Sequence, residues 1–162
     1  MFTARFAGQL AGLVMVSAMV LAAALWPGVG ALRPLQVIAS LVLGRAALDT
    51  HALSALAVGV FVHLSGPTYF WSRMFGLVVG YARHPLSWGR CLALGVAFGI
   101  VAELVDVRLL LPAAQKAING ADLWRETVPV WWDWAAHLVF GIALGLWYGR
   151  LQPRGELSSA RG

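Results

Sequence analysis

The chain has 162 residues, of which 60% are hydrophobic and 12% are charged. Soluble domains usually carry about 25% charged residues, so this composition is typical of a membrane protein. The single cysteine excludes a disulfide scaffold, and the high apolar content excludes a disordered protein. The 12 Lys and Arg residues are spread singly along the chain, which argues against a nucleic-acid partner. We therefore expect the partners to be membrane lipids and other membrane helices.

Four segments are long and apolar enough to cross a bilayer, because a crossing helix needs about 20 mostly apolar residues. They cover residues 7–26, 52–82, 91–111 and 129–149. The first ends at Pro27 and Gly28, and the third ends before Pro112, because proline cannot donate a helical hydrogen bond. The second contains Gly66-Pro67 and is longer than a straight crossing. We expect it to tilt, to kink at Pro67 or to emerge at its inner end.

The remaining segments connect the predicted crossings. Residues 35–48 are apolar but only 14 residues long, which is typical of a helix at the membrane interface. Residues 113–128 contain several polar side chains and are expected to form a hydrated loop. Residues 151–162 are polar and are expected to form a flexible cytoplasmic tail. The sequence thus predicts an all-α, four-transmembrane-helix bundle over residues 1–150, with a short interfacial helix between spans 1 and 2.

The basic residues predict the orientation, because Lys and Arg favour the cytoplasmic side of a membrane. With both termini inside, the inner side receives Arg5, Arg73, Arg83, Arg90, Arg150, Arg154 and Arg161. The outer side then receives Arg33, Arg45, Arg108, Lys116 and Arg125. This bias predicts that both termini are cytoplasmic. Tryptophans near the ends of the spans, including Trp131, Trp132 and Trp124, are expected to form aromatic belts at the membrane interface.

Each predicted crossing carries a Gly-x-x-x-Gly pair, whose spacing places both glycines on one face of a helix. The pairs are Gly8 and Gly12, Gly76 and Gly80, Gly95 and Gly99, and Gly141 and Gly145. Glycines at this spacing let two helix backbones approach closely. We expect these faces to pack helices together, either within the chain or between chains in a homo-oligomer or a larger membrane complex.

The last predicted span resembles one group of known proteins. Residues 136–149, AHLVFGIALGLWYG, are similar to the closing span of small uncharacterised bacterial inner-membrane proteins, a loose group that includes the YagU-like proteins. The resemblance implies that the protein is located in the bacterial inner membrane. It brings no catalytic residue to this chain.

Ionisable side chains within a crossing are energetically costly and are therefore candidate functional residues. Counted from the midpoints of their spans, Glu103 and His137 lie at the same depth, and His63 lies near mid-depth. A second polar layer, nearer the outer surface, is expected from Asp106, Arg108 and Asp133. We therefore expect His63, Glu103 and His137 to converge inside the bundle, beneath this second layer.

Three interpretations of this polar cluster remain open. In the first it is structural, with carboxylates neutralised by protonation or by Arg108 and histidines hydrogen-bonded across helices. In the second it forms a proton or solute pathway through a hydrated cavity. In the third it binds a metal. His63 and His137 are then axial ligands of haem b, or Glu103 completes a site of two histidines and one carboxylate.

The sequence lacks the G-x-S-x-G, H-E-x-x-H and Walker motifs that mark common hydrolases and nucleotide-binding enzymes. We therefore expect a small non-enzymatic integral membrane protein. The leading hypothesis is a transport or channel-like component with a buried His/Glu cluster. The alternatives are an accessory subunit of a larger membrane complex and an electron-transfer subunit that binds haem b or a metal.

Overall fold

A computed structural model describes residues 2–28, 30–49, 53–82 and 85–152. These residues form helices and contain no strand, so the all-α prediction is confirmed for the described part of the chain. The elements are α1 (Phe2–Leu25), α2 (Arg33–Leu43), the 3-10 turn η1 (Arg45–Leu48), α3 (Leu53–His63), the π-helix η2 (Leu64–Thr68), α4 (Tyr69–Gly80), α5 (Trp88–Ala102), the π-helix η3 (Glu103–Leu110), α6 (Leu111–Asn119), α7 (Leu123–Thr127) and α8 (Val130–Leu151). Most of the predicted tail, together with Arg83, Arg154 and Arg161 of the orientation count, lies outside the described residues.

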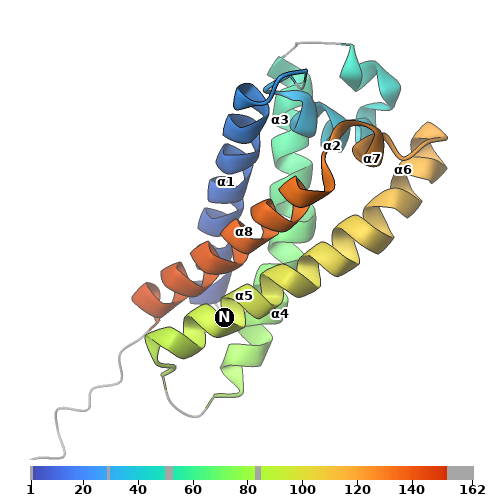
Figure 1. Ribbon diagram of the computed structural model, residues 1–162. Coiled ribbons are helices and arrows are strands. Elements are labelled where there is room, and N and C mark those ends of the chain that lie inside the picture. The colour runs from blue at the N-terminus through green and yellow to red at the C-terminus, as the bar shows by residue number, and fades with distance from the viewer. Residues whose placement is uncertain (1, 29, 50–52, 83–84, 153–162) are drawn as a thin grey trace, which may run out of the picture.

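The helical segments run along the length of the molecule (Figure 1). The long segments are α1, α3 continued by α4, α5 continued by α6, and α8. The shorter α2 and α7 lie at the end opposite the N-terminus, whereas α8 finishes at the end where α1 begins. α8 packs against both α1 and α5, and α1 also packs against α4. α1 is thus an integral part of the core.

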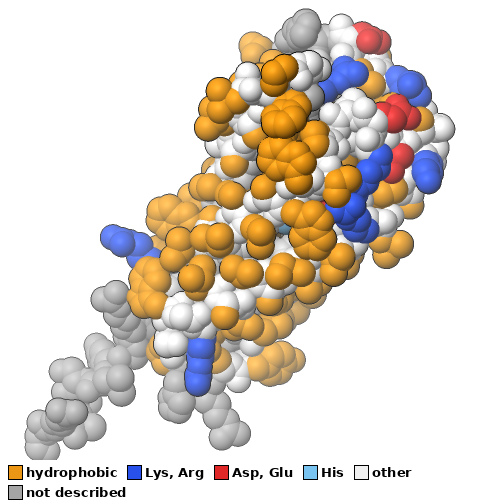
Figure 2. All heavy atoms as spheres, viewed as in Figure 1, with side chains coloured by type: hydrophobic (Ala, Val, Ile, Leu, Met, Phe, Trp, Pro, Cys, Tyr) orange, Lys and Arg blue, Asp and Glu red, His pale blue; other side chains and the backbone are white. Residues whose placement is uncertain are grey.

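Two helical segments, Phe2–Leu25 and Leu53–Gly80, are long and apolar enough to cross a membrane. They correspond to the first two predicted spans, whereas among the described residues no helix over the third or fourth predicted span meets the same criterion. Large apolar side chains are exposed along the molecule, among them Phe61 on α3, Leu104 on η3 and Leu138 on α8. Figure 2 shows hydrophobic side chains over most of the visible surface, with charged side chains mainly towards the two ends. This surface carries fewer charged side chains and more large apolar ones than is usual for a soluble protein.

The irregularity predicted near Pro67 takes the form of the π-helix η2, through which the helix continues from α3 into α4. A proline lacks the backbone N–H that would donate to an earlier carbonyl, and it perturbs the hydrogen-bond ladder. Within this segment the Leu64 carbonyl accepts a hydrogen bond from Nε2 of Gln9, on α1, at 3.2 Å. The main polar side chain of the first predicted span therefore stabilises the irregular turn of the second.

The prediction that the third helix ends before Pro112 was wrong, because the chain continues through η3 into α6. The N–H of Leu111 donates to the Asp106 carbonyl five residues earlier, which is the π pattern. The next donor in that pattern would be residue 112, which is proline, so the carbonyl of Val107 loses this partner. Arg125 Nη2 donates to this carbonyl instead, at 3.3 Å. A side chain thus compensates for the proline, and the helix does not need to stop.

The prediction of a hydrated loop over residues 113–128 was also wrong. These residues form most of α6 and all of α7, and Gln115 and Asn119 are buried. Gln115 Nε2 donates to the Val37 carbonyl of α2 at 2.9 Å, and Asn119 Nδ2 donates to Gln115 Oε1 at 2.8 Å. Asn119 Nδ2 also lies 3.2 Å from Ser40 Oγ. The polar residues of this stretch therefore join α6 to α2 in a buried hydrogen-bonded cluster.

The glycine pairs of α5 and α8 form a close helix contact. A Cβ atom added to Gly141 would lie 2.5 Å from the Gly95 carbonyl oxygen, and one added to Gly145 would lie 2.6 Å from the Cys91 carbonyl oxygen. A Cβ atom on Gly99 would collide with the His137 carbonyl oxygen. Only glycine allows backbones to approach this closely, so the two pairs fix the register between α5 and α8.

The other two glycine pairs behave differently from each other. A Cβ atom on Gly8 would collide with Ser72 of α4, and one on Gly12 would lie 2.5 Å from Thr68 Cγ2. A Cβ atom added to Gly76 would lie 3.1 Å from the Ala4 Cβ atom, which is a tight contact. Gly80 has no such neighbour within 4 Å. The contact between α1 and the second helical segment therefore uses three of these four glycines.

The glycine contact between α5 and α8 can be tested with one matched pair of substitutions. We expect Gly141→Ala to lower the free energy of unfolding in detergent by about 1–3 kcal/mol, because its Cβ atom overlaps the facing backbone. Gly80→Ala, which adds the same methyl group in open space, should change it by less than about 0.5 kcal/mol. Thermal unfolding followed by circular dichroism gives both values. Equal effects of the two substitutions would contradict the contact.

Candidate functional site

Glu103 is the centre of a buried charged cluster. It begins η3, and its side chain is 0% exposed. Its Oε1 atom lies 2.8 Å from Arg108 Nη2, and its Oε2 atom lies 3.2 Å from Nδ1 of His137 on α8. The predicted meeting of Glu103 and His137 is therefore present. Neither carboxylate oxygen has an aligned hydrogen bond, so the attraction is chiefly electrostatic.

The π-helical backbone of η3 explains why Glu103 and Arg108 can pair. Residues five apart in an α-helix point roughly 140° away from each other, since 3.6 residues make one turn. A π-helix has a wider turn with bonds between residues i and i+5, which brings such side chains closer to the same side of the helix. The sequence spacing of Glu103 and Arg108 is five residues. The irregular backbone thus supplies a counter-charge to a fully buried carboxylate.

The surroundings of His137 determine which ring nitrogen carries the proton. Nδ1 lies 2.9 Å from the Asp133 carbonyl oxygen and 3.2 Å from Glu103 Oε2. Both neighbours are acceptors, so in the neutral imidazole the hydrogen belongs on Nδ1. The Nε2 atom of His137 then carries a free lone pair. This nitrogen is therefore available to an electron-pair acceptor.

Asp133 forms a second ion pair beside the first. Its Oδ2 atom lies 2.9 Å from Nη1 of Arg125, and its Oδ1 atom accepts a hydrogen bond from Trp124 Nε1 at 2.8 Å. Sequence reasoning assigned Arg125 to a hydrated loop and Trp124 to an aromatic belt. The loop assignment was wrong because Arg125 lies on α7 and pairs with Asp133. The belt assignment of Trp124, and that of Trp132, was wrong because both side chains are buried in the core. The sequence did contain one indication of this ion pair. A carboxylate inside a crossing needs a counter-charge, and Arg125 is a cation close to Asp133 along the chain.

The predicted second layer of Asp106, Arg108 and Asp133 does not form one group. Arg108 forms an ion pair with Glu103, and Asp133 forms one with Arg125. Asp106 instead accepts a hydrogen bond from Nε1 of Trp71 on α4, at 2.6 Å. This bond links the second and third helical segments. The acidic residues are thus brought to one region of the molecule but have separate partners.

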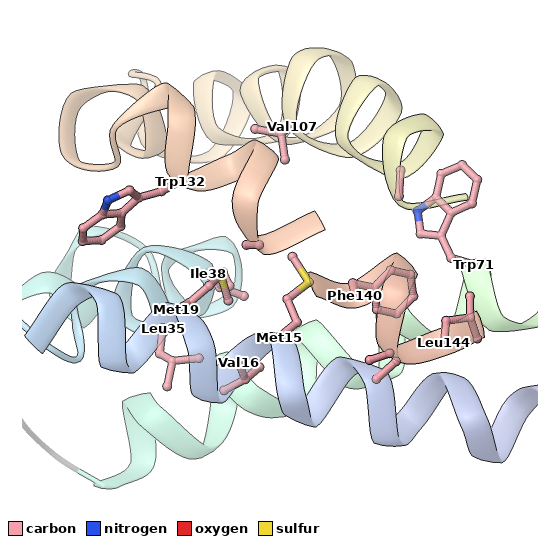
Figure 3. Packing of buried hydrophobic residues seen from close by; sticks show 14 of the residues in the cluster. Met15, Val16, Met19, Leu35, Ile38, Trp71, Val107, Trp132, Phe140 and Leu144 are labelled. Carbon is pink, nitrogen blue, oxygen red and sulfur yellow. The ribbon is translucent and has the colours of Figure 1, made fainter. Parts of the chain in front are cut away.

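A cavity of about 630 Å³ lies between α1, α2, η2, η3 and α8. Its wall is mostly apolar and includes Met15, Met19 and Phe140, while His63, His137 and Asp106 supply polar groups. Figure 3 shows Met15 and Val107 approaching this region from opposite sides, with Trp132 and Phe140 at its borders. No local sequence pattern indicates this cavity, because its wall is assembled from residues far apart in the chain.

His63 lines the cavity without joining the charged cluster. It is 6% exposed, and its Nε2 atom is buried without a hydrogen-bond partner. It lies close to the backbone of Gly12 and near enough to His137 for the two rings to interact electrostatically. A buried polar atom without a partner costs about 1–3 kcal/mol. His63 therefore presents an unsatisfied nitrogen beside the cavity.

The prediction that Glu103 would complete a metal site with His63 and His137 is not supported. Among the described residues, no three His, Cys, Asp or Glu side chains are grouped so that they could hold a metal ion. The carboxylate is instead occupied by Arg108 and by Nδ1 of His137. The two histidines remain as polar residues of the cavity wall.

The ion pair between Asp133 and Arg125 can be tested by removing its cation. We expect Arg125→Met to lower the free energy of unfolding by about 3 kcal/mol, because it leaves the Asp133 carboxylate buried without a counter-charge. Arg73→Met is the control, since Arg73 is exposed and contacts the exposed Tyr69 side chain, so we expect a loss below about 1 kcal/mol. Adding Asp133→Asn to Arg125→Met should restore part of the loss. A double variant no more stable than Arg125→Met would contradict the pairing.

Comparison with protein-family models, curated proteins and solved structures finds no match to this chain. The likeness of residues 136–149 to the YagU-like group therefore stays a prediction. What can be said about function rests on the cavity, on the two histidines beside it and on the buried ion pairs.

Proposed function

We propose that this chain is a small, non-enzymatic, multi-pass membrane protein that binds a lipid-soluble molecule in its central cavity. It would act as the binding component of a transport or carrier process. The observation that carries the proposal is the apolar cavity of about 630 Å³ with His63 and His137 in its wall. Ligand sites typically measure about 300–1,000 Å³ and combine an apolar wall with a few polar groups.

The surface of the molecule supports the membrane part of the proposal. Two helical segments have the length and hydropathy of crossings, and α5 with its continuation and α8 run along the same length. α8 ends where α1 begins, as expected for an even number of crossings. We propose four crossings with both termini on the cytoplasmic side, in a bacterial inner membrane as the YagU-like resemblance implies.

The mouth of the cavity supports a lipid-soluble ligand. Phe70, Leu110 and Trp131 belong to the cavity wall and are 50%, 55% and 54% exposed, respectively. In a bilayer, such apolar side chains face acyl chains rather than water. A ligand would then enter sideways from the lipid. Its apolar part would pack against Met15 and Phe140, and its polar end would meet the two imidazoles.

The part of the bundle nearer the N-terminal end argues against an open channel. There the glycine pairs of α5 and α8 bring the two backbones into contact. Beside them Phe75 packs edge to face on Phe98 and Tyr148, with ring centroids 5.4 Å and 5.2 Å apart. A hydrated pathway would need polar groups along this stretch as well. The geometry favours a binding site that is blocked at this end over a continuous pore.

Cavity binding can be tested with 1-pyrenemethanol, a lipid-soluble alcohol that quenches tryptophan fluorescence by energy transfer. We expect saturable quenching of the purified protein in detergent. Ala18→Phe places a ring in the cavity wall and should weaken this binding at least tenfold. Ala24→Phe adds the same ring to an exposed position of the same helix and should leave it unchanged. Identical, non-saturating quenching of all three proteins would show partition into the micelle alone and would contradict the proposal.

A further inference from the structure

We propose that the ligand of the central cavity is a lipophilic amine in its protonated form, whose positive charge pairs with the carboxylate of Asp106. This inference rests on the proposed function, because it names the chemical class of the ligand in the same cavity. It is drawn from the charges around the cavity, from the hydrogen-bond acceptors in its wall, and from its apolar and aromatic lining.

Asp106 differs from the other two acidic residues of the predicted crossings in having no counter-charge. Glu103 pairs with Arg108, and Asp133 pairs with Arg125. Both arginines act electrostatically on these two acids, but among the described residues no cation does so on Asp106. Three carboxylates therefore face two guanidinium groups, which leaves one negative charge in excess. A carboxylate away from water needs a partner, so we infer that a ligand supplies the missing cation.

The hydrogen bonds of Asp106 leave one carboxylate oxygen for a ligand. Its Oδ2 atom accepts the N–H of Trp71 at 2.6 Å, whereas its Oδ1 atom has no hydrogen bond to the described part of the chain. Both residues belong to the cavity wall, and Figure 3 shows Trp71 beside the helical segment that carries Val107, the neighbour of Asp106. A neutral carbonyl group would also accept the indole N–H, so this bond alone does not require a charged side chain.

A second acceptor in the wall suits the same ligand. The proton of His137 belongs on Nδ1, so its Nε2 atom offers a lone pair. An ammonium group carries several N–H donors, and the carboxylate and this nitrogen are both acceptors. Asp133, the other acidic residue of the wall, already pairs with Arg125, and the described wall contains no Lys or Arg. The wall therefore favours a cationic end of the ligand and disfavours an anionic one.

The rest of the cavity suits the apolar body of such an amine. Met15 and Phe140 give it apolar surfaces on which to pack. Phe70 and Trp131 line the cavity and are about half exposed at its mouth. The faces of aromatic rings attract cations, so these two side chains can accompany the charge as it leaves the lipid. Burial of the apolar body would supply most of the binding free energy, and Asp106 would select the charge.

The test compares three pyrene probes that differ in charge. At neutral pH 1-pyrenemethylamine is protonated, 1-pyrenemethanol is neutral and 1-pyrenecarboxylate is an anion. Each is titrated into the purified full-length protein in a non-ionic detergent, and binding is followed by quenching of tryptophan fluorescence. We expect the amine to bind at least tenfold more tightly than the alcohol, and the carboxylate to bind more weakly than the alcohol. The net charge of the chain, +5, would by itself favour the opposite order.

Two matched substitutions assign the preference to one residue. Asp106→Asn keeps an acceptor for Trp71 but removes the charge, and should bring the ratio of the amine and alcohol affinities close to one. Asp49→Asn removes the same charge from an exposed position that does not belong to the described cavity wall, and should keep the ratio. Ala18→Phe, in the wall, should weaken binding of the amine at least tenfold. Circular dichroism checks that each variant is folded.

The outcomes separate this inference from the proposed function. Saturable binding of the alcohol with no preference for the amine would overturn the charge pairing and leave the cavity function intact. Failure of all three probes to bind saturably would overturn both. A preference that survives in folded Asp106→Asn, or that Asp49→Asn abolishes as well, would overturn the role of Asp106. The order of the three probes in the unmodified chain tests the charge pairing without any variant.

Discussion

The burial of the Glu103 carboxylate is the constraint on which the rest of this structure depends. A charge removed from solvent must be paired, and here Arg108 supplies the counter-charge while Nδ1 of the neutral His137 ring faces the carboxylate. The pairing with Arg108 requires the π-helical turn, and the pairing with His137 requires α5 and α8 to meet in one register. The glycines of these helices provide that register. A single buried charge thus connects an unusual backbone segment to an unusual helix contact.

The two π-helical segments among the described residues share a feature. Each contains or precedes a proline, and each has a carbonyl that accepts a side-chain hydrogen bond from another helix, from Gln9 at η2 and from Arg125 at η3. Both segments border the cavity. A widened turn displaces the following side chains and opens space that regular helices would fill. We infer that the irregular backbone shapes the cavity and that the two side chains stabilise it.

The sequence could predict those features that depend on local periodicity. The depths of Glu103 and His137 follow from a constant rise per residue, and the glycine faces follow from a spacing of four. The contact between the two residues, and the packing of Gly95 against Gly141, are accordingly both present. The helical character of α1, of α3 with α4, of α5 and of α8 has the same origin.

The remaining features depend on contacts between distant residues. Pro112 ends a helix only if nothing replaces its missing hydrogen bond, and its replacement, Arg125, comes from another element. The polarity of Gln115 and Asn119 shows that they need partners, but it does not distinguish water from α2. Trp124 is buried because Asp133 accepts its N–H, which no local pattern indicates. The cavity also depends on contacts between distant residues, since at least four helical segments contribute to its wall.

The most direct test of this account is nitrogen NMR of the full-length chain labelled at histidine, with the signals of His137 assigned by comparison with His137→Asn. The account predicts a neutral ring with its proton on Nδ1, facing Asp133 and Glu103, and a bare Nε2 atom. A proton on Nε2, or ring signals that do not respond to Glu103→Gln, would show that the carboxylate does not hold this imidazole and would contradict the central claim.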